Sequence, residues 1–241
     1  MKHIALESVD STNNYIKIQP FPENGEWLVV TAEYQTSGRG SASNSWESAK
    51  GENLLFSIRF RPENIKANQM FVLSQTMALS VCRTLISYKK DFCIKWPNDI
   101  YYCDKKIVGM LIENDLMGAY VNNCIIGVGV NINQTCFTSK APNPISLAQI
   151  IGVPIQKEEV FRKIMQEFNA LYNIIKRQEY RQIHDMYMNL LYRKGTIHTY
   201  RDTNGLFQGT IADVQPSGHL VVYDQDGHMR RYDFKEIEYI I

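Results

Sequence analysis

Residues 95–113 read KWPNDIYYCDKKIVGMLIE, and this stretch predicts two strands and a functional site. Pro97 cannot donate a hydrogen bond to a sheet and the Asn-Asp pair at 98–99 favours a turn, so one strand is expected to end here with polar groups projecting from it. The mainly apolar run at 105–113 predicts a second strand, buried on both faces. Gly109 within that run marks a place where a ligand or another backbone comes close. The alternative is a surface hairpin with solvated charges.

A second informative segment, residues 35–57, reads QTSGRGSASNSWESAKGENLLFS. Its small residues let backbone N–H groups approach an oxyanion, and Arg39 adds a fork of donors that suits phosphate or carboxylate. The segment therefore fits a phosphate-binding loop, although mobile connectors have the same composition. It is neither a Walker A loop nor a Rossmann fingerprint, because the spacing that each requires is absent. Trp46 in so polar a loop needs either a core slot or a flat ligand to cover.

Together these segments resemble the catalytic domain of biotin protein ligases. The resemblance rests on short motifs that occur in the family's order and span most of the first 135 residues. These motifs are Ser11-Thr12-Asn13, Gln35 with Gly38-Arg39-Gly40, Trp46, Gly51-x-Asn53-Leu54, Lys95-Trp96-Pro97-Asn98-Asp99, Lys105-Lys106-Ile107-Val108-Gly109-Met110-Leu111-x-Glu113 and Gly127-Val128-Gly129-Val130-Asn131. One match alone would mean little, whereas the ordered set is specific.

The resemblance implies an α/β (α+β) fold over residues 1–192, like the catalytic domain of class II aminoacyl-tRNA synthetases, with a mixed sheet and flanking helices. It also implies an AMP-forming ligase reaction that uses ATP and Mg²⁺. The carboxylate of biotin attacks the α-phosphorus of ATP, giving biotinyl-5′-adenylate and pyrophosphate. A lysine of a biotin carboxyl carrier protein domain then attacks the mixed anhydride to form an amide. Because two negative groups meet in the first step, cations and N–H donors are needed at the reacting phosphorus.

The resemblance assigns site residues motif by motif. Lys106 is expected between the carboxylate and the α-phosphate, and the other catalytic candidates are Arg39, Asp99 and Lys95. The residues expected to bind biotin are Ser11, Thr12, Asn13, Gln35, Gly38, Arg39, Gly40, Lys106 and Gly109. Those expected to bind the nucleotide are Arg39, Trp46, Asn98, Lys106 and Asn131. No metal ligand is assigned.

Several of these residues have a second interpretation. Ser11 is also suited to be the N-cap of a helix that begins just after it. Asp99 is a base for the incoming lysine, a metal ligand or a loop anchor. Trp46 either closes its loop over the adenylate or fills a core slot. The glycines at 127 and 129 make room for ligand or mark a strand bulge.

The sequence departs from the family pattern directly after Gly40. Many members continue with arginine and further basic residues, whereas this chain has Ser41-Ala42-Ser43-Asn44. Fewer cations therefore face the intermediate. We expect biotinyl-adenylate to be held mainly by Lys95, Lys106 and loop closure, and to escape faster than from members with the extra arginine.

Apolar periodicity places the motifs on strands and helices. Strands are expected near residues 3–6, 27–33, 53–60, 105–113 and 120–132, and helices at about 69–88, 157–177 and 180–191. Residues 135–145 are expected to form a surface loop that orders over the nucleotide. Over residues 193–241 turn signals recur about every ten residues, which predicts a small all-β unit. It is similar to the SH3-like barrel that closes many biotin ligases.

Composition restricts the class of protein. With 241 residues, 44% of them hydrophobic, the chain can bury one substantial core. Its 26 Lys plus Arg nearly balance 25 Asp plus Glu, so no long-range field argues for nucleic acid or an anionic membrane. Scattered cysteines suit a reducing cytoplasm, and isolated histidines give no metal-binding motif. We expect a cytoplasmic monomer or homodimer without signal peptide or membrane span.

Three alternatives bear on function. The residues before Ser11 are too few for a DNA-reading domain, so no repressor activity and no DNA partner are expected. The nearest enzymatic alternative is a lipoate or octanoate protein ligase or transferase, but the KWPND segment and the Gly-Arg-Gly loop favour biotin. A non-catalytic biotin or nucleotide sensor would not need Lys106, Arg39 and Asp99 together.

Overall fold

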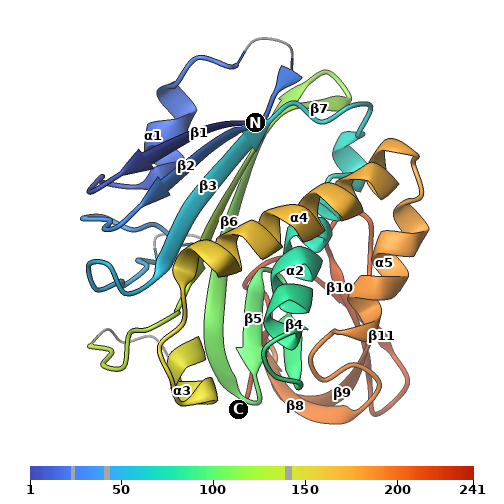
Figure 1. Cartoon of the computed structure of the whole chain (residues 1–241). Coiled ribbons are helices and arrows are strands. Elements are labelled where there is room, and N and C mark those ends of the chain that lie inside the picture. The colour runs from blue at the N-terminus through green and yellow to red at the C-terminus, as the bar shows by residue number, and fades with distance from the viewer. Residues whose placement is uncertain (23–24, 41–43, 139–142) are drawn as a thin grey trace.

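The computed structural model describes residues 1–22, 25–40, 44–138 and 143–241. A seven-stranded mixed sheet forms the larger part, and a five-stranded antiparallel sheet follows it (Figure 1). The strands of the larger sheet are β1 (Lys2–Leu6), β2 (Leu28–Ala32), β3 (Leu54–Phe60), β4 (Phe92–Lys95), β5 (Asp99–Tyr102), β6 (Lys105–Met117) and β7 (Tyr120–Val130). The helices are α1 (Thr12–Ile18), the 3-10 turn η3 (Ala67–Gln69), α2 (Phe71–Ile86), α3 (Leu147–Ile151), α4 (Lys157–Lys176) and α5 (Tyr180–Asn189).

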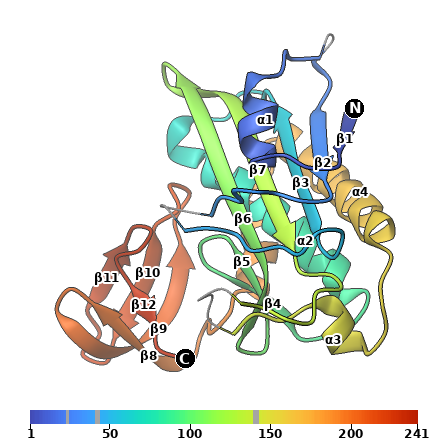
Figure 2. The same cartoon turned by 90° about the vertical axis from the view of Figure 1, so that its left-hand side faces the viewer.

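The smaller sheet, called the C-terminal sheet from here on, stands where the sequence predicts an SH3-like barrel. Its strands are β8 (Ile197–Asp202), β9 (Gly205–Val214), β10 (Leu220–Asp224), β11 (Met229–Tyr232) and β12 (Glu238–Tyr239), in the order β11-β10-β9-β8-β12. It lies beside the β4 and β5 end of the larger sheet (Figure 2). The mixed sheet with flanking helices and the terminal β unit confirm the predicted fold class.

The larger sheet has the order β1-β2-β3-β7-β6-β5-β4, with β1 and β2 parallel and the other neighbours antiparallel. Because side chains alternate along a strand, β7 serves two layers. Its residues Ile126 and Val128 belong to the main core with α2, α4 and α5, whereas Ile125 packs with Ile16 of α1 on the opposite face. Alternation puts Gly127 and Gly129 on the α1 face, where they leave space above the sheet.

Two elements were not predicted from the sequence. Strand β5 is only four residues long, and its Tyr-Tyr pair hides any alternation. Helix α3 is five residues long, but a start signal was present: Ser146 and Gln149 form a reciprocal capping box. Gly152, in the left-handed conformation at φ 90°, ends the helix. Of the loop predicted at 135–145, residues 139–142 lie outside the described part of the chain.

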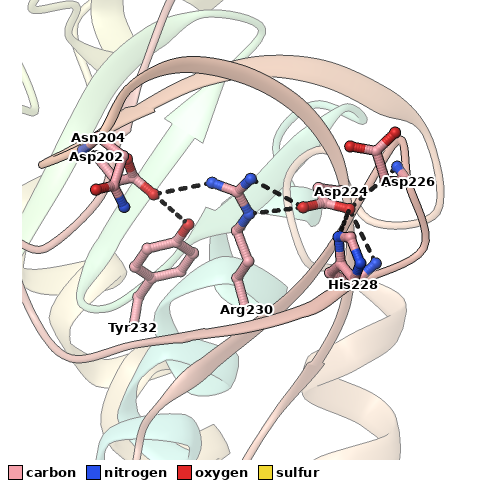
Figure 3. A network of polar contacts seen from close by, with 7 residues as sticks. All are labelled: Asp202, Asn204, Asp224, Asp226, His228, Arg230 and Tyr232. Carbon is pink, nitrogen blue, oxygen red and sulfur yellow. Dashed lines mark hydrogen bonds and ion pairs between the residues drawn. The ribbon is translucent and has the colours of Figure 1, made fainter.

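A polar network stabilises the C-terminal sheet (Figure 3). Arg230 of β11 lies between two carboxylates, pairing with Asp202 at 3.1 Å and with Asp224 at 2.8 Å. Tyr232 donates a second hydrogen bond to Asp202 at 2.8 Å. Both carboxylate side chains are 5% exposed, so the network links β8, β10 and β11 below the surface. No helix in the described residues is long and apolar enough to cross a membrane.

Candidate active site

A polar pocket lies between the start of α1 and the glycines of β6 and β7. Its lining includes these predicted residues: Ser11, Thr12, Asn13, Gln35, Arg39, Gly40, Trp46, Asn98, Asp99, Lys106 and Gly109. The lining also includes Gly127 and Gly129, which were expected to make room for ligand, and five residues that were not assigned to it: Asn44, Ser45, Met110, Leu111 and Val128. Segments up to about a hundred residues apart in the chain therefore meet in one place.

The floor of the pocket is a pair of cross-strand glycines, Gly109 and Gly129, which face each other in register. A Cβ on Gly109 would lie 2.7 Å from Cζ3 of Trp46, and one on Gly129 would lie 2.4 Å from Cε2. The indole ring of Trp46 therefore lies over both glycines. The register runs unbroken through them and shifts only between Asp115 and Leu116, so the bulge interpretation is wrong. Within the described residues the buried indole N–H of Trp46 has no hydrogen-bond partner.

Gly127 makes the same kind of room for Asn13. A Cβ on Gly127 would lie 2.2 Å from the carboxamide oxygen of Asn13. The amide of Asn13 donates to Glu113 at 2.8 Å, and its oxygen accepts from Ser57 at 2.6 Å. The hydroxyl of Ser57 also lies 2.7 Å from that of Thr12. Ser57 was missed from the sequence, although a serine between Phe56 and Ile58 in the mainly apolar strand LLFSIRF was a usable signal.

Helix α1 is capped by a residue from another segment. The side-chain oxygen of Gln35 accepts hydrogen bonds from the backbone N–H of Thr12 at 2.7 Å and from its hydroxyl at 3.0 Å. Ser11 occupies the N-cap position, but its side chain makes no capping hydrogen bond. The predicted N-cap position of Ser11 is confirmed, whereas its hydroxyl does not cap the helix. The side chain is 2% exposed and lines the pocket.

Lys106 forms an ion pair inside the pocket. Its Nζ lies 2.7 Å from Oδ1 of Asp99, and the two side chains are 26% and 15% exposed. The backbone of Lys106 pairs with Tyr101 of β5 and with the segment after residue 142, donating to Asn143 at 2.9 Å and accepting from Ile145 at 3.0 Å. These contacts fix the backbone of Lys106, and the ion pair with Asp99 holds its ammonium in the pocket.

Arg39 forms a second, two-pronged ion pair. Its Nη2 lies 3.1 Å from Oε1 of Glu113, and its Nη1 lies 3.3 Å from Oε2. The guanidinium also donates to Asn14 at 2.8 Å. The fork of donors predicted to bind a ligand is thus held by a carboxylate of the protein. Because the side chain is 40% exposed, a ligand anion can compete with Glu113 for it.

The family model described as Biotin/lipoate A/B protein ligase family matches residues 5–131. The chain belongs to the biotin/lipoate A/B protein ligase family. The match ends at Asn131, so it contains every segment that lines the pocket.

Similar proteins and solved structures agree with this family. The bifunctional ligase/repressor BirA of Bacillus subtilis (strain 168) is 28% identical over 95% of this chain and 71% of its own length. The BirA of Bacillus spizizenii is 29% identical over 86% of this chain and 65% of its own length, so this chain spans about two thirds of these relatives. The fold matches that of the Aquifex aeolicus biotin protein ligase in complex with biotin and ATP, with a TM-score of 0.81, 23% identity, and coverage of 98% of this chain and 97% of that chain.

Three residues assigned to the site lie outside the lining of the pocket in this family member. Gly38 accepts a hydrogen bond from the backbone of Trp46 at 2.8 Å and so shapes the loop. Asn131 donates to the carbonyl of Ile145 at 3.2 Å, which supports the segment beside Lys106. The ammonium of Lys95 lies 4.3 Å from the ring centroid of Tyr239 in the C-terminal sheet.

Lys95 lies outside the lining of the pocket, and its catalytic role stays a prediction. Burial lowers the pKa of its ammonium, while Asp99 opposes that effect. The side chain packs on Tyr239 and, at 5.4 Å, on Tyr101. Attraction between the cation and these two aromatic faces stabilises the side chain in this position. A lysine inside the KWPND motif gave no sign of this from the sequence, because its partner is 144 residues away.

A cluster in the C-terminal sheet has the residue types of a metal site. The ligand atoms of Asp224, Asp226 and His228 lie within 4.8 Å of one another (Figure 3). No metal motif was predicted from the sequence, although the spacing D-x-D-x-H at residues 224–228 could have indicated this cluster. Asp224 already accepts hydrogen bonds from Arg230 at 2.9 Å and from the backbone of His228 at 2.9 Å. A metal ion would have to displace these bonds, and we assign none.

Proposed function

We propose that this chain is a biotin protein ligase that activates biotin with ATP and transfers the biotinyl group to a lysine of a biotin carboxyl carrier protein domain. The observation that carries the proposal is the meeting of the polar start of α1 with the Lys106–Asp99 ion pair in one pocket. Family membership and the names of the relatives support it. The Aquifex aeolicus ligase that shares the fold was solved with both biotin and ATP.

The polar residues around α1 suit the head of biotin. Its ureido group has one carbonyl acceptor and two N–H donors, and the pocket offers hydroxyls and carboxamides from Ser11, Thr12, Asn13 and Gln35. Three of these side chains are oriented by hydrogen bonds to other protein groups, so they are fixed before a ligand arrives. The indole N–H of Trp46 is a further donor that a bound ligand would satisfy.

In the first step an oxygen of the biotin carboxylate forms a bond to the α-phosphorus, and the bond from that phosphorus to pyrophosphate breaks. The ammonium of Lys106 reduces the repulsion between the two anions, and Asp99 keeps that ammonium in place. Arg39 adds its fork of donors when it exchanges Glu113 for an anionic ligand oxygen. Asp99 is the carboxylate among the described lining residues that would hold the Mg²⁺ of MgATP, and such an ion would supply positive charge for the departing pyrophosphate.

In the second step the amine of the acceptor lysine attacks the acyl carbon, and the bond between the acyl group and the phosphate oxygen breaks to release AMP. The amine must lose a proton to become a nucleophile. Asp99 is the carboxylate placed to accept or orient that proton, because it lies beside Lys106 at the reacting end of the pocket. Its role as base, metal ligand or anchor is separated by comparing Asp99→Asn with Asp99→Glu in each half-reaction.

The test uses purified protein with ATP, Mg²⁺ and either radiolabelled biotin or radiolabelled lipoate, with and without a biotin carboxyl carrier domain. We expect pyrophosphate release with biotin alone and label on the carrier only when biotin and ATP are both present. Label from lipoate would favour the lipoate ligase. Binding without pyrophosphate release would favour a sensor. The expected absence of repressor activity stays a prediction, which a gel-shift measurement with biotin-operator DNA checks.

A further inference from the structure

We propose that the C-terminal sheet positions the pocket residues Asn98 and Asp99 through Trp96. In this inference Trp96 is a positioning residue, because its side chain touches the C-terminal sheet and not the pocket. The inference rests on the proposed function, since catalysis is one of its readouts. It goes further by giving the C-terminal sheet a defined part in the reaction.

The segment from Lys95 to Asp99 faces two ways. Lys95 and Trp96 contact the C-terminal sheet, while Asn98 and Asp99, two and three residues after Trp96, line the pocket. Asn98 forms two hydrogen bonds with Met110 of β6. The backbone N–H of Met110 donates to the carbonyl of Asn98 at 2.9 Å, and the side-chain amide of Asn98 donates to the carbonyl of Met110. Because only Pro97 separates Trp96 from Asn98, a displacement of Trp96 would also displace the turn that carries Asp99.

Trp96 is anchored by a buried hydrogen bond. Its indole N–H donates to the carbonyl of Gly218, in the turn between β9 and β10, at 2.8 Å, and the side chain is 2% exposed. The ring also packs edge-on against Phe234 of the C-terminal sheet, with centroids 5.4 Å apart. A buried donor and a buried carbonyl that satisfy each other resist separation, because each would be left unpaired.

Gly218 is shaped for this contact. Its φ of +99° lies in the left-handed region that favours glycine. A Cβ at this position would lie 3.0 Å from the ring of Phe71 in α2 and 3.5 Å from Phe234. The turn thus inserts its backbone between aromatic rings of both parts of the molecule. Such a close approach holds the Gly218 carbonyl at one distance from Trp96.

A second attachment lies on the neighbouring residue. The ammonium of Lys95 rests on the face of Tyr239, which is 8% exposed. The backbone of Ile94, one residue earlier, is bonded to Leu190 at 2.8 Å and to Tyr192 at 2.9 Å in the segment that leads into the C-terminal sheet. Ile94, Lys95 and Trp96 are therefore all held by residues of the chain after position 189. In the proposal, this attachment sets the distance between Asp99 and Lys106.

The first test compares Trp96→Phe with the wild-type chain. Phenylalanine keeps an aromatic ring but removes the N–H, so the Gly218 carbonyl loses its partner. We expect kcat for biotinyl-adenylate formation to fall about tenfold, because displacement of reacting groups by a fraction of an ångström is costly. The KM for biotin should stay within about twofold, since the α1 residues that meet its head are unaffected. Phe234→Leu, at a half-exposed position that tolerates change, should give a smaller fall in kcat.

The matched control is His184→Ala. His184 of α5 also joins the two parts of the molecule, because its Nε2 lies 3.0 Å from Oδ1 of Asp213 in β9, and it lies outside the lining of the pocket. We expect kcat within about twofold of wild type. An equal loss in His184→Ala and Trp96→Phe would overturn the inference, because any loosened contact would then suffice.

A double-mutant cycle shows whether Trp96 acts through Asp99. In an Asp99→Asn background, Trp96→Phe should lower kcat by less than about twofold, because the group that it positions is already disabled. Two losses that multiply independently would show that Trp96 acts elsewhere, and would contradict the proposal.

Hydrogen–deuterium exchange separates this inference from the proposed function. In Trp96→Phe, amides of residues 98–102 should exchange several times faster than in wild type, and those amides should be unchanged in His184→Ala. This measurement needs no biotin or ATP. Absence of biotinyl-adenylate in the wild type would remove the proposed function, whereas unchanged exchange in Trp96→Phe would remove the positioning role.

Discussion

The pocket and the C-terminal sheet both contain ion pairs between basic and acidic side chains, but the carboxylates of the two regions differ in burial. In the C-terminal sheet, Arg230 pairs with two carboxylates that are each 5% exposed and that also accept backbone N–H groups. In the pocket, the carboxylate side chains of Asp99 and Glu113 are 15% and 25% exposed, and each forms an ion pair with one cation among the described residues.

This difference separates structural charge from functional charge. A buried network in which every oxygen is occupied can only be broken at a cost, because removal of one partner leaves the others unpaired. A more exposed ion pair is screened by solvent and can exchange its partner for a ligand. Mutations in the two regions should therefore affect different measurements, and the following predictions test that separation.

The largest effect is expected for Lys106→Gln. Glutamine keeps a polar side chain, one bond shorter than lysine, but removes the charge that reduces the repulsion between the two anions. Biotinyl-adenylate formation should fall by roughly 100-fold or more, the cost of losing one strong electrostatic stabiliser. Pyrophosphate release measures this loss. The thermal midpoint should remain within a few degrees of wild type, and an equally active, folded variant would contradict the proposed chemistry.

Gly129→Ala should have the next largest effect. The new Cβ would lie 2.4 Å from the indole of Trp46, so the ring must leave its place over the glycines. We expect the KM for biotin or ATP to rise about tenfold and the tryptophan fluorescence of the unliganded protein to change. The control is Ala49→Gly, at an exposed position of the same loop that lies outside the lining of the pocket. Unchanged kinetics would show that the position of Trp46 does not matter.

Ser41→Arg tests whether the pocket has too few cations to retain its intermediate. Residues 41–43 lie outside the described part of the chain, so the prediction rests on sequence. An added arginine next to Gly40 should slow the release of bound biotinyl-adenylate several-fold by adding donors for the phosphate. Rapid-dilution measurements of the off-rate give the result, with Ser41→Gln as the uncharged control. Equal off-rates would discard the hypothesis of fast escape.

Arg230→Met should have the smallest effect on catalysis. We expect kcat within about twofold of wild type, but a thermal midpoint lower by on the order of 5 °C, because Asp202 and Asp224 lose their shared partner. A large loss of kcat with an unchanged midpoint would reverse the comparison between the two regions.

The same network predicts a dependence on pH. Burial alone would raise the pKa of Asp202, but hydrogen bonds from Tyr232, the backbone of Asn204 and Arg230 outweigh it and lower the pKa below 3.8. The pKa of Asp224 is lowered in the same way. A depressed pKa stabilises the fold at pH above the ordinary value of 3.8, and this contribution is lost as the pH falls through the lowered value. The gap in midpoint between wild type and Arg230→Met should therefore shrink below pH 3.8.

The fold was largely predictable from the sequence, because its long strands and helices carry clear periodicity. The same holds for most of the pocket lining, since its motifs lie at strand ends and in one loop. What the sequence hid was the partner of each residue. Gly109 and Gly129 were expected to admit a ligand, yet Trp46 lies over them; Arg39 was expected to face a ligand, yet Glu113 holds it. The contact of Lys95 with Tyr239 could not be predicted, because that partner belongs to the C-terminal sheet.

The hydrogen bond from Asn13 to Glu113 joins residues that are 100 positions apart in the chain. Strand β6 must therefore be in place before the side chain of Asn13 in α1 can be oriented. Strand β7 must pair with β6 before Gly109 and Gly129 can form the floor of the pocket. A chain still emerging from the ribosome has none of these contacts until its first 130 residues are free to fold. Binding competence should thus arise late in synthesis and abruptly, and no amino-terminal fragment that stops short of β7 should capture the vitamin.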